Sequence, residues 1–262
     1  MAALSELHRI QSMLDKTEIV SDPERAAKAA KIIAIARADG RTALTETEAK
    51  QVFSAYGLPI AQTRLAESEN EAVEMAKSIG FPVVMKIISP DIVHKSDAKG
   101  VKVNIMDEAG VRETYKTILA NAKGYKADAN IHGIAVQEMA PWGTEVIVGS
   151  VNDPTFGPTI MFGLGCIFVE VLKDVTFRVA PVNKSQIEQM LTEIRGAPML
   201  QGVRGELPRD RAALVDILYQ YAIMVSDLVD EIFETDANPI LDYEDGKGVK
   251  IVDARIILKN KE

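Results

Sequence analysis

A single lysine interrupts an otherwise apolar segment of the chain. Lys86 stands within residues 83–88, a run that we interpret as a buried strand because its other members are all apolar. A charge in such a strand is costly unless an opposite charge meets it, and a phosphate group would serve. The alternative is an edge strand from which the lysine reaches solvent. Phosphate binding by Lys86 is therefore one of two open interpretations.

The loop that follows this strand concentrates groups suited to phosphoryl chemistry. Residues 89–100 contain His94 and its neighbour Lys95, with Lys99 close behind. An imidazole can take up a phosphoryl group, and nearby ammonium groups can neutralise its oxygens during transfer. A loop histidine is more often a solvated surface residue. His94 is our candidate catalytic residue, with plain surface exposure as the alternative.

Oxygen-bearing side chains alternate along a strand that we expect near the C-terminus. Glu234, Asp236 and Asn238 are spaced two apart, so their side chains share one face of the strand. A turn at 245–246 would place Asn238 directly opposite Asp253 in an antiparallel hairpin. Mg²⁺ bound to nucleotide phosphates commonly takes one or two such ligands. The alternative is the polar, solvent-facing side of an edge hairpin.

Two further features could bring positive charge or backbone N–H groups to a phosphate. Gly163 and Gly165 follow an expected strand and would allow close approach of a nucleotide, although a tight turn explains them equally well. The segment completes neither a dinucleotide fingerprint nor a P-loop. Arg178, Arg204 and Arg209 could hold phosphate by bidentate contacts, but such residues more often pair on the surface.

Composition limits the classes of function. The 262 residues carry a net charge of −8, which argues against general binding of nucleic acid or of anionic membranes. No apolar run is long enough to span a bilayer, and the single cysteine, Cys166, cannot form an internal disulfide. The start of the chain lacks the order of a signal peptide. We expect a cytoplasmic protein with no nucleic-acid partner and no membrane partner.

Helical periodicity, capping residues and β-branched runs divide the chain into elements that can position these groups. We expect helices at 4–16, 23–38, 45–57, 68–79, 108–122, 185–194 and 209–229. Strands are expected at 83–88, 101–105, 133–139, 145–151, 159–162, 231–241 and 249–258. The fold class is α+β, with an N-terminal helical extension over 1–43, one lobe over 44–125 and a second lobe over 126–262.

Several of these segments together resemble a known family. They are 84–90 (VMKIISP) leading into 94–97 (HKSD), 137–139 (QEM), 143–146 (GTEV), 162–165 (FGLG) with 168–172 (FVEVL), and 177–181 (FRVAP). Over 44–258 the chain resembles the ATP-grasp, beta-type subunit of ADP-forming acetate–CoA ligases and, more distantly, succinyl-CoA synthetase beta chains. The resemblance implies an ATP-grasp fold of two lobes with ATP or ADP bound between them.

The resemblance also implies roles for individual residues. The family's phosphate lysine corresponds to Lys86, and Asn238 and Asp253 fall where the family holds Mg²⁺. The adenine would be lined by Gln137, Glu138 and Met139, and Glu145 would lie near the ribose or phosphate end. His94 looks like the family's second phosphorylated histidine, which is loaded from a histidine on the partner subunit.

An activity with a partner follows from the resemblance. This chain would transfer a phosphoryl group between a phosphohistidine and ADP/ATP while an alpha-type, CoA-binding subunit forms the acyl phosphate, in an α2β2 hetero-oligomer. Two alternatives stay open: a carboxylate–amine ligase that needs no phosphohistidine, and a nucleotide-sensing domain with a damaged site. The second is motivated by Lys99 and Cys166, which stand where the family has glycines.

Overall fold

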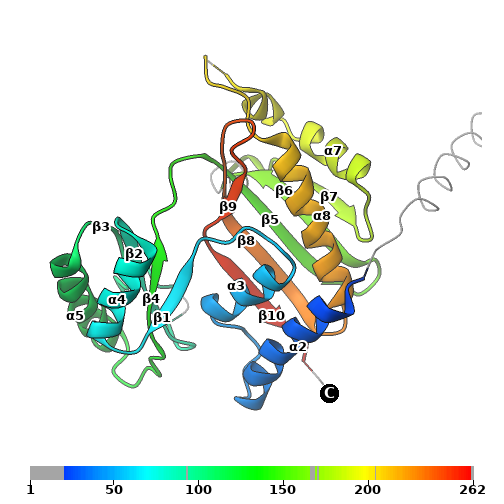
Figure 1. Cartoon of the computed structure of the whole chain (residues 1–262). Helices are drawn as coiled ribbons and strands as arrows, with labels where there is room; N and C mark the ends of the chain where they lie inside the picture. The colour runs from blue at the N-terminus through cyan, green and yellow to red at the C-terminus, as the bar shows by residue number, and fades with distance from the viewer. Residues whose placement is uncertain (1–20, 93, 166–168, 170, 204, 261–262) are drawn as a thin grey trace, which may run out of the picture.

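The computed structural model describes residues 21–92, 94–165, 169, 171–203 and 205–260. The expected helix at 4–16, Cys166 and Arg204 lie outside the described residues. The described chain forms two antiparallel sheets, each backed by helices, with α3 between them (Figure 1). Within the described ranges, no helix combines the length and apolar character needed to cross a bilayer.

The first sheet has four strands in the order β1-β4-β2-β3, and β2 is interior. Helices α4 and α5 pack against one face of this sheet, which leaves the face that carries Lys86 turned away from them. The edge-strand alternative for Lys86 is therefore wrong. The bounds are β1 Thr63–Ala66, α4 Glu69–Ile79, β2 Val83–Ile88, β3 Val101–Ile105, α5 Glu108–Tyr125 and β4 Gly133–Glu138.

The second sheet is ordered β10-β8-β5-β6-β7, with β9 also paired to β8. Its buried face packs on α8, and Tyr221 of α8 donates a hydrogen bond to the carbonyl of Thr235 at 2.9 Å. The bounds are β5 Thr144–Asp153, β6 Gly157–Leu164, β7 Val175–Val179, α7 Lys184–Glu193, the 3-10 helix η1 Ala197–Gln201, α8 Arg211–Asp227, β8 Ile232–Asp242, β9 Val249–Ile251 and β10 Ala254–Leu258.

The two N-terminal helices of the described chain pack into the core of the second sheet. They are α2 (Pro23–Ala38), capped by Asp22, and α3 (Glu46–Ala55), which begins with the expected capping box of Thr45 and Glu48. Phe53 of α3 meets the ring of Tyr221 edge-on at 5.8 Å between centroids.

The sheets distribute the chain differently from the expected lobes. Helix α3, expected in lobe one (44–125), packs into the second core, whereas β4, expected in lobe two (126–262), pairs with β1 and β2 in the first sheet. Periodicity predicts that a strand exists but not which strands flank it, because pairing is set by long-range packing. The short strands β1 and β7 were not expected from the sequence.

The predicted register of the C-terminal hairpin is confirmed. Ala237 pairs with Ala254 and Ile240 with Ile251, so Asn238 lies opposite Asp253. The backbone N–H of Asn238 donates to the carbonyl of Asp253 at 3.2 Å. The hairpin therefore brings both candidate metal ligands to one edge of the second sheet.

Candidate functional site

One buried carboxylate lies at the centre of the candidate site. Glu46, in the first turn of α3, accepts hydrogen bonds from Lys50 at 2.7 Å and from Lys86 at 2.8 Å on one oxygen. Its other oxygen accepts from Lys95 at 2.8 Å. The Glu46 side chain is only 2% exposed. Burial by itself would raise the pKa of Glu46, but the three ammonium groups outweigh it and hold this pKa far below its ordinary value.

Lys50 connects this carboxylate to the first sheet. Its ammonium group donates to the Gln137 side-chain oxygen at 2.6 Å and to the Thr63 hydroxyl at 3.1 Å. The Lys50 side chain is 1% exposed. Burial, and then the nearby charge of Lys86, lower the pKa of Lys50 to about 8 even though Glu46 opposes the shift. The Lys50 ammonium group therefore loses its proton at a lower pH than an ordinary lysine does.

Lys86 joins the two sheets. Its ammonium group lies 2.8 Å from Glu46 and 3.4 Å from a carboxylate oxygen of Asp253, which follows β9 in the second sheet. Burial by itself would lower the pKa of Lys86, but Glu46 and Asp253 together raise it. Within this hydrogen-bonded cluster, three lysine ammonium groups face two carboxylates, those of Glu46 and Asp253. Such a site is suited to an anion with several charges, such as a polyphosphate.

The oxygen groups opposite Lys86 fit a divalent cation held jointly with phosphates. Asn238 and Asp253 are directly opposed on neighbouring strands, so their side chains leave the sheet on the same face. Asp253 is 34% exposed, and one of its oxygens already accepts the N–H of Ala254. No group of three or more acidic, His or Cys side chains that could hold a metal occurs among the described residues. Two protein oxygens suit Mg²⁺ that takes its remaining ligands from phosphate and water.

The end of β4 reaches toward the second sheet. Glu138 accepts hydrogen bonds from Lys250 of β9 at 2.8 Å and from the backbone N–H of Gln62 at 2.9 Å. The N–H of Glu138 donates to the carbonyl of Gln62, and the N–H of Met139 donates to that of Pro82. Residues 137–139 therefore lie where the two sheets approach each other, next to Lys50.

His94 lies in an exposed loop that is folded back on itself. Its carbonyl accepts the N–H groups of Asp97 and Ala98, and the carbonyl of Lys95 accepts the N–H of Gly100. A side chain at Gly100 would meet Ile87 at 2.5 Å, so this close approach requires glycine. The His94 side chain is exposed, as the surface alternative expected, yet Lys95 next to it is bound to Glu46.

Residues 35–258 match the family model of the ATP-grasp domain, which is most of the chain. The chain belongs to the ATP-grasp family. It is 50% identical over 235 residues to the acetate–CoA ligase [ADP-forming] I subunit beta of Pyrococcus furiosus, a match that covers 90% of this chain and 100% of that one. The resemblance found in the sequence is confirmed.

Solved structures agree with this ATP-grasp assignment. A crystal structure of a protein from Pyrococcus horikoshii Ot3 superposes with a TM-score of 0.87 at 49% identity, covering 90% of this chain and 99% of that one. The dinucleotide-forming acetyl-coenzyme A synthetase 1 of Ca. Korarchaeum cryptofilum gives a TM-score of 0.78 at 44% identity, covering 88% and 100%. That structure contains coenzyme A and Mg-AMPPCP, and its phosphohistidine segment points towards the nucleotide binding site.

The ATP-grasp fold brings together only part of the residue set expected from the sequence. Lys86, Gln137, Asn238 and Asp253 are linked by the contacts above. Arg178 instead pairs with Glu193 of α7 at 2.6 Å. Strand register places Arg178 on the sheet face of Ile160, which is opposite to the face of Asp236 and Asn238. Arg209 likewise pairs with Glu206.

Gly163, Gly165 and Glu145 form a separate group where β5 and β6 lie side by side. Gly165 has a φ of +42°, a conformation that favours glycine, and its N–H donates to the carbonyl of Glu145 at 2.8 Å at the end of the β5–β6 ladder. A side chain at Gly163 would meet Val169 at 2.7 Å. Glu145 itself is exposed. Among the described residues, no hydrogen bond or ion pair joins this group to Lys86, and its nucleotide role stays a prediction.

Two central residues of the candidate site, Glu46 and Lys50, were missed. They are four residues apart on α3, which looks in the sequence like an ordinary surface ion pair. The available signal was their position: both fall on the helix face that also carries Ala49 and Phe53 and is buried. A charged pair on the apolar face of a helix indicates buried partners elsewhere in the fold.

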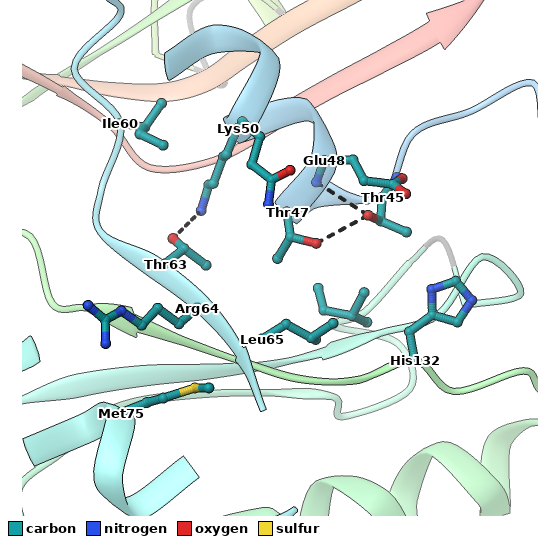
Figure 2. A pocket seen from close by; sticks show the side chains of 12 residues that line it. Thr45, Thr47, Glu48, Lys50, Ile60, Thr63, Arg64, Leu65, Met75 and His132 are labelled. Atoms are coloured by element: carbon teal, nitrogen blue, oxygen red, sulfur yellow. Dashed lines mark hydrogen bonds between the residues drawn. The ribbon is translucent and has the colours of Figure 1, made fainter. Parts of the chain in front are cut away.

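A cavity of about 430 Å³ lies beside Lys50 (Figure 2). Lys50 lines it and points from α3 toward Thr63 on β1 (Figure 2). Leu65 of β1 and His132, directly before β4, also border it (Figure 2). Ile88, also in the lining, is two residues beyond Lys86 and so shares its sheet face. The cavity therefore lies on the same side of the first sheet as Lys86 and the carboxylate of Glu46 that it contacts.

Proposed function

We propose that this chain is the nucleotide-binding, beta-type subunit of an ADP-forming acyl-CoA ligase of the acetate–CoA ligase kind. It transfers phosphoryl between a phosphohistidine and ADP/ATP while acyl-CoA, ADP and phosphate are interconverted with acid, CoA and ATP. The observation that carries the proposal is the shared carboxylate of Glu46. It holds together Lys86, the candidate phosphate lysine between the sheets, and Lys95, the neighbour of His94.

In the transfer, a ring nitrogen of His94 attacks the γ-phosphorus of ATP. The N–P bond forms as the P–O bond to ADP breaks, and ADP leaves with the electron pair; the reverse reaction makes ATP. Lys86 neutralises the phosphate oxygens between the sheets, and Lys95, next to the histidine, is bound to the carboxylate of Glu46. Mg²⁺, held by Asn238 and Asp253, would neutralise further phosphate charge when bound.

The remaining nucleotide contacts are proposed at two levels of support. Gln137, Glu138 and Met139 would line the adenine. The hydrogen bonds from Lys50 to Gln137 and to Glu46 support this, because they place these residues next to the proposed phosphate site. The place of Glu145 near the ribose rests on the family resemblance alone. Phosphate contacts of Gly163 and Gly165 stay a prediction from the residue types, as does that of Arg178, whose side chain pairs with Glu193 instead.

The partner is proposed to be an alpha-type, CoA-binding subunit that carries the first phosphohistidine, in an α2β2 hetero-oligomer. The relative from Pyrococcus furiosus is named as a subunit beta, which supports the need for a second subunit. This chain has no complete dinucleotide-type fingerprint of its own. We propose a cytoplasmic location, with which the single cysteine agrees.

The test is phosphoryl labelling of the purified chain with Mg²⁺ and γ-labelled ATP. We expect an acid-labile, base-stable label that is lost in His94→Ala. The matched control is His132→Ala, which removes the other histidine of the described chain, located directly before β4 and in the lining of the cavity. The control should label like the unchanged chain.

Two outcomes would overturn the proposal. Label that persists in His94→Ala would place the chemistry on another residue. Tight ADP binding without any label, with or without an active alpha-type subunit, would favour a carboxylate–amine ligase or a nucleotide sensor.

A further inference from the structure

The carboxylate of Glu46 touches two lysines with different expected roles. Lys86 belongs to an interior strand and is the candidate phosphate ligand, whereas Lys95 belongs to the loop of the candidate nucleophile. Glu46 itself is on α3, which packs in the core of the second sheet. One buried side chain thus links the second core, the first sheet and the histidine loop.

We propose that Glu46 is a positioning residue for phosphoryl transfer, which aligns the Lys86 ammonium group with the nucleotide and, through Lys95, holds the His94 loop beside it. The proposal rests on the proposed function and adds to it a residue that neither binds phosphate nor reacts. A buried anion would repel phosphate, so Glu46 can act only through the ammonium groups that it orients.

The geometry of the loop explains why fixing the position of Lys95 also restricts the position of His94. Lys95 is the next residue along the chain, about 3.8 Å away between Cα atoms. The bonds from Asp97 and Ala98 to His94, and from Gly100 to Lys95, close residues 94–100 into a compact turn. The Lys95–Glu46 contact, with Lys95 22% exposed, then fixes this turn to α3.

The competing explanation is that Glu46 only neutralises buried lysines and so maintains the fold. That role concerns Lys50 and Lys86, which are almost fully buried, far more than Lys95. Replacing Lys95 leaves both buried pairs in place. Lys95→Gln therefore separates positioning of the loop from stability of the core.

A second lysine provides a matched control in the same loop. Lys126 pairs with Asp91, near the start of the loop, at 3.0 Å, and this pair is solvent-exposed. Lys126→Gln removes one positive charge and one ion pair of the loop without touching Glu46. The two variants therefore differ mainly in which end of the loop is released.

The experiment measures the single-turnover rate constant of histidine labelling at saturating Mg-ATP, and separately the dissociation constant for ADP. In Lys95→Gln we expect the rate constant to fall by about 10- to 100-fold, because misplacing a reacting group costs rate rather than ground-state binding. ADP affinity should change by less than about 2-fold. Lys126→Gln should stay within about 2-fold of the unchanged chain in both quantities, and Lys95→Arg, which keeps the ion pair, should recover most of the rate.

A double variant decides whether Lys95 acts through Glu46. In Glu46→Gln the rate should fall and ADP should bind more weakly, because Lys86 loses its nearest partner. Adding Lys95→Gln to Glu46→Gln should slow labelling no further if the two residues act as one unit.

Three results would overturn the inference. Lys95→Gln could label as fast as Lys126→Gln, so that the contact to Glu46 would not matter for transfer. The effects of Glu46→Gln and Lys95→Gln could multiply, so that Lys95 would act directly on the phosphoryl group. Absence of any histidine label in the unchanged chain would instead remove the proposed function, and this inference with it.

Discussion

Replacing Lys50 by methionine should change how the stability of the protein depends on pH. Burial lowers the pKa of Lys50 from 10.5 to about 8 in the folded chain, despite the contact with Glu46. This difference corresponds to about 3 kcal/mol that the folded state gives up to keep Lys50 charged at neutral pH. Methionine has a similar length and carries no charge, so the variant lacks this cost.

The sign follows from proton binding. Because the folded pKa is below the unfolded one, the folded state binds fewer protons than the unfolded state between about pH 8 and pH 10.5. The contribution of Lys50 to the free energy of unfolding therefore rises with pH across this window and is lost as pH falls through 8. Between about pH 7 and pH 9.5 the increase amounts to about 2 kcal/mol.

The assay is urea unfolding of the unchanged chain and of Lys50→Met at a series of pH values. The stability of Lys50→Met relative to the unchanged chain should fall by about 2 kcal/mol from about pH 7 to pH 9.5. Any constant loss, for example of the hydrogen bond from Lys50 to the Gln137 oxygen, cancels in this comparison. The control is Lys102→Met, at an exposed position of β3, which should keep the original pH profile. Parallel profiles for Lys50→Met and the unchanged chain would refute the reasoning.

Three further predictions concern the loop, the metal ligands and a buried carboxyl group. Lys99 has a φ of +46°, so Lys99→Gly should raise the free energy of unfolding in urea by up to about 1 kcal/mol, and a loss of stability would contradict this. Asn238→Ala should raise the Mg²⁺ concentration for half-maximal labelling by roughly 10-fold; an unchanged value would exclude Asn238 as a ligand. Burial raises the pKa of Asp242 to about 7, so its contribution to stability falls as pH rises from 3.8 toward 7. Asp242→Asn should therefore gain on the unchanged chain over that range in thermal unfolding, and a constant difference would contradict this.

Local features of the sequence were enough to predict most elements and one essential pairing. The capping residues of α3, the apolar run of β2 and the spacing of the last hairpin each depend on neighbours within a few residues or on a single turn. The register that places Asn238 opposite Asp253 followed from the turn position alone, because an antiparallel hairpin has only one register for a given turn. Lys86 in β2 was also identified from local sequence, because it is the one charged residue within an apolar strand.

Only the tertiary structure decided which charges meet. Glu46 lies 40 residues from Lys86 and 49 from Lys95, and no periodicity reports contacts over such separations. The sequence also did not predict that β4 pairs within the first sheet. Nor did it predict that Arg178 pairs with Glu193, on the face of the second sheet opposite to Asn238. The physical reason is that local patterns select helices, strands and turns. The partner of a buried charge depends on how the sheets and helices pack together. A charge needs a compensating partner only after this packing has removed it from water.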